Sequence, residues 1–278
     1  MKKQSRIRIL TECSILIALA SVLSVIKLVD MPYGGSVTPA AMLPIMLFAY
    51  RHGTKWGLAC ATVYGVVQQL LGLENLSYFT TWQSVVGIIL LDYIVAYAAV
   101  GLGGIFRRVE KNQSLALLYG ALLVSFLRYV CHVISGAILW AAYDFALPEG
   151  ATVLYSIGYN ATYMLPEAII LVAAAMYLGD VLDFRRDIPV RIRTERADTA
   201  SVVCRLLGGL LAVAAAVFAV VTVFPALQDP ESGEFTFALL GGLNWALILP
   251  VLAVCLVASA VLFTVSHLRG KNNLAAGN

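Results

Sequence analysis

Charge is what this sequence has least of. Only 13% of its 278 residues are Asp, Glu, Lys or Arg, whereas 60% are hydrophobic. Soluble domains carry about 25% charged residues, so a water-facing surface of this size would need roughly twice the charge. The mean hydropathy of +0.86 and the long uninterrupted apolar runs agree. The sequence excludes an ordinary soluble domain and predicts an all-α integral membrane protein.

Motifs for disulfides, metals and nucleotides are also missing. The five cysteines stand singly within apolar runs, without a CxxC pair or a His at metal-ligand spacing, so we expect neither a disulfide nor a metal site. No GxxxxGKS or GxxxxGKT motif is present, so any ATP must be hydrolysed by partner subunits. We therefore expect no enzyme activity and no cofactor, and the net charge of +3 gives no indication of a nucleic-acid partner.

Apolar runs near the ~20 residues that cross a bilayer predict about eight helical segments. They cover 9–26, a short stretch at 38–50, 56–71, 82–106, 114–141, 152–178, 205–226 and 236–266. With the N-terminus inside and the chain alternating, all of the 19 Lys and Arg except Lys27 and Arg128 fall in cytoplasmic segments. We expect a multi-pass protein of the cell membrane with both termini in the cytoplasm.

A change in composition divides the chain. Residues 180–200 are dense in charge, and the two apolar segments beyond them consist mostly of Ala, Val and Leu. This pattern predicts a six-helix working domain at 1–180, a charged cytoplasmic linker at 181–204, and a two-helix membrane appendage at 205–278.

Ionisable side chains inside a membrane span cost roughly 2.5 to 3.5 kcal/mol on insertion scales and are functional candidates by default. Within the first six segments the deep ones are Asp92, Arg128, His132 and Glu167. Asp92 and His132 lie at nearly the same depth, and Arg128 lies one turn below His132 on the same helix face. Gly136 and Trp140 continue that face outward, and Gly136 would let a flat ring approach the backbone.

The outer half of the sixth segment brings phenols and a carboxamide to a similar depth. It carries Tyr155, Tyr159, Asn160 and Tyr163. Together with the deep residues, this composition suits a small planar cation. Asp92 would supply the counter-charge, and Trp140 and Tyr155 would stack on the ring. Asn160 and His132 would hydrogen-bond its nitrogens.

Each of these residues also has a purely structural interpretation. Asp92 and Arg128 would neutralise each other as an interior ion pair, and His132 would be a packed, hydrogen-bonded helix residue. Glu167 would satisfy backbone that the preceding proline frees. Tyr78 is expected in an aromatic belt at the membrane interface. The shared depth of so many polar groups favours a binding site over these separate explanations.

The sequence resembles the thiamine-specific S components of energy-coupling factor (ECF) transporters over roughly residues 8–180. The ordered combination of five stretches carries this resemblance: ILTECSILIALA, YRHGTKWG, LDYIVAYAAVGLGGIF, LRYVCHVISGAILWAAY and LYSIGYN. It implies a six-helix membrane domain that binds thiamine near the outer surface, under the loop between the first two helices. It also implies partners, namely a shared transmembrane subunit and two ATPase subunits.

The resemblance assigns a role to each matching position. Asp92 would be the carboxylate that faces the thiazolium ring, with Tyr93 as its neighbour. His132 would hydrogen-bond the ligand, and Trp140 would stack on its pyrimidine ring.

Further positions surround this set. Tyr155 and Asn160 would complete the ring and hydroxyethyl contacts. Arg128 occupies a basic family position that supports the carboxylate, and Tyr33 stands near a family tryptophan that covers the site. On the first helix, the family uses small residues at four-residue spacing to dock on the shared subunit. Here that row reads Ser14, Ala18 and Val22.

The sequence departs from the family pattern in three places. Asp92 stands where the best-known members have a glutamate, and Tyr33 is the aromatic residue of a first outer loop that has no indole. Both departures bear on affinity more than on substrate class. Val22 is bulkier than the docking pattern requires, and the last two apolar segments lie outside the resemblance.

Three other functions remain as alternatives. An S component for a precursor such as hydroxymethylpyrimidine would leave Asp92 without a cation to meet. A stand-alone secondary transporter would use the two extra helices and a proton relay through Asp92, His132 and Glu167. An intramembrane hydrolase would pair His132 with Ser135 or Ser156, but no GxSxG or HExxH motif supports it.

Overall fold

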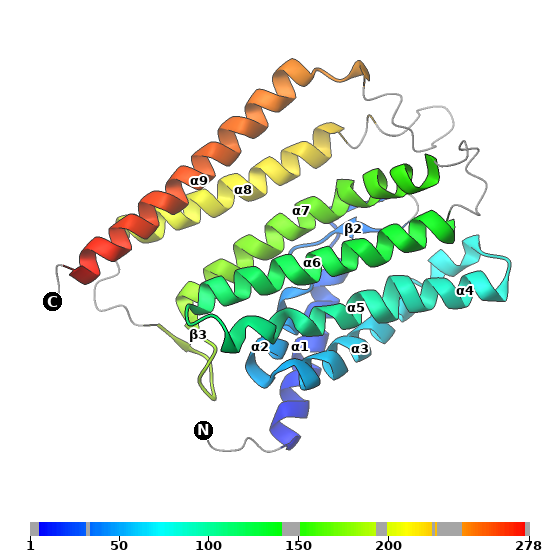
Figure 1. The fold of residues 1–278 in the computed structure, drawn as a ribbon, viewed down its shortest axis with the longest axis horizontal. Helices are drawn as coiled ribbons and strands as arrows, with labels where there is room; N and C mark the ends of the chain where they lie inside the picture. Colours follow the sequence, from blue (N-terminus) through cyan, green and yellow to red (C-terminus); the bar gives the residue numbers. More distant parts are fainter. Residues whose placement is uncertain are drawn as a thin grey trace. The chain divides into compact units, whose positions relative to one another are not determined.

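The computed structural model describes residues 6–31, 34–140, 151–192, 199–223, 226 and 241–275. The chain divides into two compact units, Met1–Arg191 and Ile192–Asn278. Helices dominate both units (Figure 1), and each strand of the two short β-hairpins has only two residues. The predicted all-α membrane fold is therefore confirmed.

The first unit is a bundle of helices with one hairpin after its first helix and one after its last. In chain order its elements are α1 (Arg6–Val25), β1 (Val29–Asp30), β2 (Ser36–Val37), α2 (Leu43–His52), α3 (Thr54–Leu71), η1 (Leu73–Tyr78), α4 (Trp82–Ile88), η2 (Ile89–Val95), α5 (Ala96–Ala98), η3 (Ala99–Arg108), α6 (Gln113–Ile138), α7 (Ala151–Val181), β3 (Leu182–Asp183) and β4 (Val190–Arg191). β1 pairs antiparallel with β2, and β3 pairs antiparallel with β4.

The stretch from α4 to η3 is one continuous helix whose winding changes along its length. η2 is a π-helix and η3 is a 3₁₀ helix. The helix begins at the side chain of Thr81, which accepts a hydrogen bond from the Ser84 backbone N–H. α6 begins in the same way, because the Asn112 side chain accepts a bond from the Leu115 N–H. Both caps satisfy donors that a helix start leaves unpaired.

Six described helices are long and apolar enough to cross a membrane. They are Arg6–Val25, Trp82–Arg108, Gln113–Ile138, Thr152–Val181, Val203–Val223 and Trp245–Ser266. The predicted segments 38–50 and 56–71 form α2 and α3, which are not among these six. α2 has ten residues, about 15 Å, or half of a bilayer core. α3 is less apolar because it carries buried glutamines, Gln68 and Gln69.

Backbones approach closely where α3 crosses η3. A Cβ atom on Gly101 would lie 2.5 Å from the Gly57 carbonyl carbon, and one on Gly57 would lie 2.6 Å from the Gly101 carbonyl oxygen. Small residues at helix crossings allow the close packing on which membrane bundles depend. This crossing holds α3 against the helix that carries Asp92.

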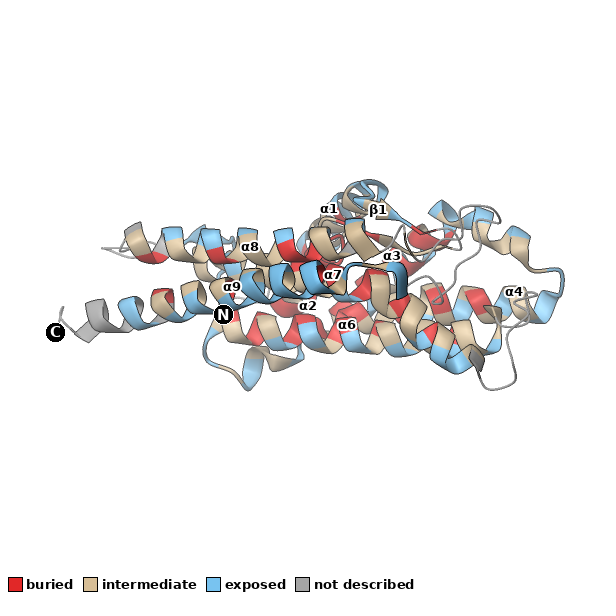
Figure 2. Cartoon of the chain, turned by 90° about the horizontal axis from the view of Figure 1, so that it is seen from above, coloured by how far each residue is buried: buried red, intermediate tan, exposed pale blue. Residues whose placement is uncertain are grey.

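Large apolar side chains remain exposed along the helices of both units. Exposed positions recur on every long helix (Figure 2), and they include Leu154, Phe126 and Leu210. In a soluble protein such surfaces would be a liability, whereas lipid tails cover them in a bilayer. The exposed surface therefore agrees with a multi-pass membrane protein.

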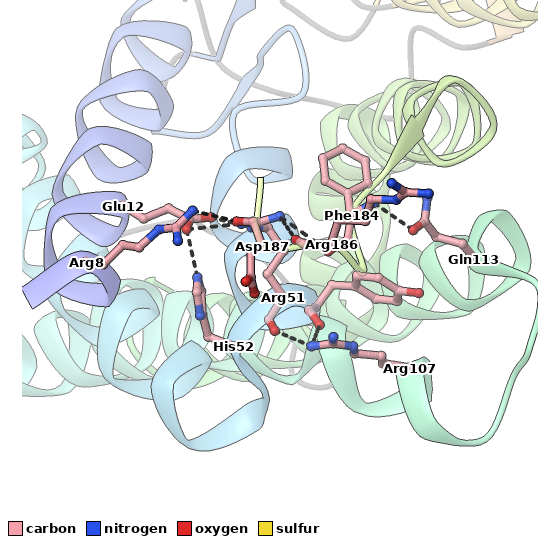
Figure 3. Close-up of polar contacts among 10 residues, drawn as sticks. Arg8, Glu12, Arg51, His52, Arg107, Gln113, Phe184, Arg186 and Asp187 are labelled. Carbon is pink, nitrogen blue, oxygen red and sulfur yellow. Dashed lines mark hydrogen bonds and ion pairs between the residues drawn. The ribbon is translucent and has the colours of Figure 1, made fainter. Parts of the chain in front are cut away.

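A polar cluster closes one end of the first unit (Figure 3). Arg51 at the end of α2 pairs through two nitrogens with the carboxylate of Glu12 on α1. Its guanidinium also donates to the carbonyl oxygens of Phe184, Arg186 and Asp187 in the turn between β3 and β4. A single buried arginine thus connects α1, α2 and the turn that follows α7.

The second unit consists of α8 (Thr199–Val223) and α9 (Trp245–Ala275), which pack along each other. Hydroxyl groups join them, because Ser201 Oγ lies 2.8 Å from Ser266 Oγ and Ser259 Oγ donates to the Gly208 carbonyl. Residues 236–240 of the last predicted segment lie outside the described residues, and α9 begins at Trp245. The functional division into 1–180, 181–204 and 205–278 stays a prediction.

Candidate binding site in the first unit

A cavity of about 610 Å³ lies inside the first unit. α1, the β1–β2 hairpin, α3, η1, η2, α6 and α7 all contribute to its wall. Every described residue of the predicted site lines it: Asp92, Tyr93, His132, Gly136, Trp140, Tyr155 and Asn160, with Arg128 and Glu167. Tyr33 lies outside the described residues. The structure therefore brings together groups that are up to 75 residues apart in the chain, from Asp92 to Glu167.

Asp92 lies in the π-helical stretch η2 and is buried. Its Oδ1 lies 2.9 Å from His132 Nδ1. Its Oδ2 accepts hydrogen bonds from Ser135 Oγ at 2.7 Å and from Trp140 Nε1 at 3.2 Å. A π-turn redirects side chains relative to a regular helix and is frequent at functional sites. Three groups on α6 and just after it thus hold one carboxylate in a fixed orientation.

The His132 ring is oriented by the same carboxylate. Because Nδ1 faces Asp92, the other ring nitrogen, Nε2, is left for a further partner. Nε2 is buried and forms no hydrogen bond with any described residue. A buried polar atom without a partner is costly, so it marks a place where a bound molecule would gain a hydrogen bond.

Aromatic rings surround Trp140 and Tyr155. The Trp140 ring centroid lies 5.6 Å from that of Tyr78 and 4.8 Å from that of Phe79. Tyr155 stacks on Tyr159 at 6.1 Å with an interplanar angle of 18°. Tyr78 lines the cavity beside Trp140, and its place in an interfacial belt stays a prediction. The short 3₁₀ helix η1, which the sequence does not signal, turns it inward.

Arg128 pairs with Glu167 and not with Asp92. Arg128 Nη1 lies 3.1 Å from Glu167 Oε2, and both side chains are 6% exposed. The arginine also packs on the Tyr97 ring, 4.6 Å from its centroid. Since Asp92 bonds to His132, the alternative of an Asp92–Arg128 ion pair is wrong. Glu167 therefore has a specific charged partner, whether or not it also satisfies backbone groups that the preceding proline frees.

Three predicted contacts are already engaged within the protein. The Asn160 carboxamide accepts from Tyr163 OH at 2.6 Å and donates to the Ser156 carbonyl at 2.9 Å. Tyr93 OH accepts from Asn75 Nδ2 at 2.9 Å. A Cβ atom on Gly136 would collide with the Ser156 hydroxyl, so this glycine allows close packing of α6 on α7.

Acidic groups outnumber basic groups among the described residues that line the cavity. The carboxylates are Asp30, Glu74, Asp92 and Glu167, and the permanent cations are Lys27 and Arg128. Both cations are paired, since Lys27 Nζ lies 2.8 Å from Asp30 and Arg128 bonds to Glu167. An acidic surplus in the wall of a cavity favours a positively charged molecule and disfavours an anion.

Catalytic and metal chemistry find no support in the described part of the chain. No group of three His, Cys, Asp or Glu residues there is placed to hold a metal ion. The hydroxyl of Ser135 donates to Asp92 and that of Ser156 donates to the Val133 carbonyl. Neither serine is thus arranged as a nucleophile activated by His132.

The predicted docking row on α1 lies at the surface. Ser14, Ala18 and Val22 are all exposed, on one face of the helix. α1 itself is held loosely by packing, since only Ile9 and Ala20 of its residues are buried.

The structure adds two residues to the predicted binding site: Ser135, named above only for the hydrolase alternative, and Thr38, which the sequence left without a role. Ser135 bonds to Asp92, and its position three residues after His132 on the same helix face was a usable signal. Thr38 donates to Glu167 Oε1 at 2.6 Å. Four residues of irregular chain, 39–42, separate it from α2, although a helical segment was predicted from residue 38, so no helical periodicity indicates where its side chain points.

Comparison with known proteins agrees with this architecture. The family model described as Thiamine transporter protein (Thia_YuaJ) matches residues 10–183. The thiamine transporter ThiT of Bacillus subtilis (strain 168) is 37% identical over 182 residues, which cover 61% of this chain and 89% of that protein. The thiamine transporter ThiT of Lacticaseibacillus paracasei is 24% identical over 207 residues, covering 67% of this chain and 96% of its own length. The chain therefore belongs to the Thia_YuaJ family of thiamine transporter proteins.

Proposed function

We propose that this chain is the substrate-binding (S) subunit of an ATP-driven ECF-type importer and that it captures thiamine from outside the cell. The observation that carries the proposal is the buried Asp92 carboxylate, held by His132, Ser135 and Trp140 in the wall of an acidic cavity. Thiamine joins a cationic thiazolium to an aminopyrimidine. Such a ligand needs a counter-charge, aromatic faces and hydrogen-bonding groups together.

Asp92 would meet the thiazolium, with Tyr93 beside it. His132 would offer Nε2 to the ligand, because Asp92 already occupies Nδ1. Trp140 would stack on the pyrimidine, with Tyr78 and Phe79 keeping its ring in place. A desolvated contact between a cation and an indole contributes about 2 kcal/mol or more.

Tyr155 and Asn160 would complete the contacts from α7. Since Tyr163 OH already bonds to the Asn160 carboxamide oxygen, a ligand bond there would replace an internal one. Gly136 lines the cavity where α6 packs on α7, and it belongs to the proposed substrate-binding set. Tyr33 keeps its proposed role as the aromatic residue that covers the site.

Arg128 and Glu167 would support the site without contacting the charged part of the ligand. Each neutralises the other in a place where a single charge would be costly. Their pairing leaves Asp92 as the buried carboxylate of the cavity available to a cation, whereas Glu74 is exposed.

The partners of this subunit are proposed to be the ECF transmembrane subunit and two ATPase subunits. Ser14, Ala18 and Val22 would form the docking row on α1, where exposure and small side chains permit close helix contact for the first two positions. The basic residues near the Arg51 cluster favour a cytoplasmic location for that end of the first unit. The distribution of Lys and Arg along the sequence favours the same location for both termini.

The acidic cavity weighs against the uncharged precursor hydroxymethylpyrimidine as the main substrate. A proton relay through Asp92, His132 and Glu167 is disfavoured because Glu167 is engaged by Arg128 and not by His132.

The importer is tested by uptake of labelled thiamine into cells that express this chain with or without the ECF transmembrane and ATPase subunits. We expect uptake only with the complete set, and no immediate loss when a protonophore is added while ATP is maintained. Uptake without the ATPase subunits that a protonophore abolishes would instead indicate a secondary transporter.

A further inference from the structure

One wall of the cavity is formed by the turn and the second strand of the first hairpin, together with Thr38, the residue that follows this strand. Gly34, Gly35, Ser36 and Thr38 all line the cavity. We call residues 34–38 the wall segment. Val37, in β2, pairs with Val29 of β1, so the wall segment includes the second strand of the hairpin.

Three residues of α7 hold the wall segment. Tyr159 OH donates to the Gly34 carbonyl at 2.9 Å, and a Cβ atom on Gly35 would lie only 2.8 Å from the Tyr163 ring. Thr38 Oγ1 donates to Glu167 Oε1 at 2.6 Å. Tyr159, Tyr163 and Glu167 are four residues apart, so they form one stripe along the helix.

The wall segment and the stripe on α7 have matching lengths. Eight residues of α-helix separate Tyr159 from Glu167, which is about 12 Å. The four residue steps from Gly34 to Thr38 span at most about 13 Å of extended chain. The wall segment therefore lies along the stripe from end to end, with a hydrogen bond at each end.

The Thr38 end of the segment is strained. Ala40 has a φ of 58°, which is uncommon for a residue other than glycine, and its N–H bonds to the Thr38 carbonyl at 2.8 Å. Strained backbone persists where surrounding contacts determine it. Thr38 supplies such a contact, since its hydroxyl donates to Glu167 and also accepts from the Ala41 N–H at 3.4 Å.

Arg128 keeps the Glu167 carboxylate in position. Its guanidinium lies between the Tyr97 ring, the Met42 sulfur at 2.8 Å and Glu167 Oε2 at 3.1 Å. Arg128, Glu167 and Thr38 are each 5% exposed or less as whole residues. Hydrogen bonds to a charged group are shorter and stronger than neutral ones, as the 2.6 Å distance to Thr38 illustrates.

We propose that Thr38 is a positioning residue, and that its bond to the Arg128-paired Glu167 anchors the wall segment and sets how long a ligand stays in the cavity. This inference rests on the proposed function for its ligand. Thr38 itself acts through the wall segment that follows the α7 stripe.

The test compares Thr38→Val, which removes the hydroxyl and keeps the branched shape, with Thr38→Ser, which keeps the hydroxyl. Association and dissociation of thiamine are followed by stopped-flow tryptophan fluorescence on the purified full chain. We expect Thr38→Val to dissociate about tenfold faster, as loss of a charge-assisted hydrogen bond implies, with association changed less than twofold. Thr38→Ser should restore slow dissociation. A dissociation rate in Thr38→Val equal to that of the wild type would overturn the proposal.

A second measurement does not depend on the ligand. Hydrogen exchange of the amides of residues 35–38 in the protein without thiamine should be faster in Thr38→Val than in the wild type and Thr38→Ser. Unchanged exchange would contradict the anchor. If the wild type does not bind thiamine, the proposed function fails, while the exchange comparison still decides whether Thr38 anchors the wall segment.

Discussion

The clearest prediction concerns Asp92, because replacing it with the isosteric Asn removes its negative charge while keeping most of its hydrogen bonds. Asp92→Asn keeps the shape and one acceptor oxygen, which can still receive the bonds from Ser135 and Trp140. The new amide would face His132 Nδ1, and the imidazole can adapt by moving its proton to Nε2. The site should therefore remain folded while it loses its negative charge.

The magnitude follows from the electrostatics of a buried pair. Two unit charges about 5 Å apart interact by about 3 kcal/mol at an effective dielectric constant of 20. Asp92 is a buried residue, so solvent screens little of this interaction. We expect thiamine affinity to fall about 100-fold in Asp92→Asn, whereas the neutral pyrimidine half of thiamine should lose less than about tenfold.

Isothermal titration calorimetry of the purified wild type and Asp92→Asn with both compounds measures the difference. Thermal unfolding of the two proteins without added compound is the control for structural damage. An equal loss of affinity for both compounds would refute the reasoning, because Asp92 would then be structural and would not serve as the counter-charge.

Three further predictions concern other parts of the molecule. Trp140→Ala and Asn160→Ala should each weaken thiamine binding by about one to a few kcal/mol in the same calorimetric assay, whereas Trp82→Ala, at a position 71% exposed and outside the cavity lining, should not. Arg51→Ala should lower the free energy of unfolding by about 3 kcal/mol, because Glu12 then keeps only His52 as its ionic partner and the carbonyl groups of Phe184 and Arg186 lose the guanidinium, whereas Arg186→Ala at an exposed ion pair should cost less than about 1 kcal/mol. Reversible unfolding in mixed detergent and SDS compares the two, and equal losses would show that Arg51 is not the connecting residue. Gly101→Ala should destabilise by about 1 to 3 kcal/mol because of the close backbone of α3. Gly209→Ala, inside α8 and with no atom within 4 Å of a new Cβ, should be neutral or stabilising by up to about 1 kcal/mol in the same assay.

Much of the fold follows from the sequence because hydropathy and length determine a membrane helix. The long segments near 9–26, 82–106, 114–141 and 152–178 correspond to α1, the α4–η3 helix, α6 and α7. The proximity of Asp92 and His132 was also predictable, because both lie a similar number of residues below the outer ends of their predicted helices. Such counting needs only the helix rise and the positions of the outer ends.

The pairing of the buried charges was not predictable in the same way. Depth placed Arg128 near Asp92, but the structure pairs Arg128 with Glu167. Rotation about a helix axis decides between such partners, and the π-turn of η2 changes the rotation of Asp92 without any recognised sequence signal.

Contacts made by segments without regular secondary structure could not be predicted from the sequence. Thr38 bonds to Glu167, which lies 129 positions away in the chain. The turn after Thr38 has a positive φ at Ala40, and since this residue is not a glycine, the sequence does not signal the turn. Glu12 similarly interrupts an apolar run on α1, and only the fold shows that Arg51 and His52 neutralise it.

Intrinsic tryptophan fluorescence of the detergent-purified chain, titrated with thiamine, shows whether thiamine binds in the cavity beside Trp140. Trp140→Phe removes the indole proposed to stack on the ligand, and Trp82→Phe is the matched control at an exposed position. We expect saturable quenching with a dissociation constant on the order of nanomolar, about −12 kcal/mol, in the wild type and in Trp82→Phe, and no such quenching in Trp140→Phe. No response of the wild type up to millimolar thiamine, or equal quenching in both variants, would contradict this expectation.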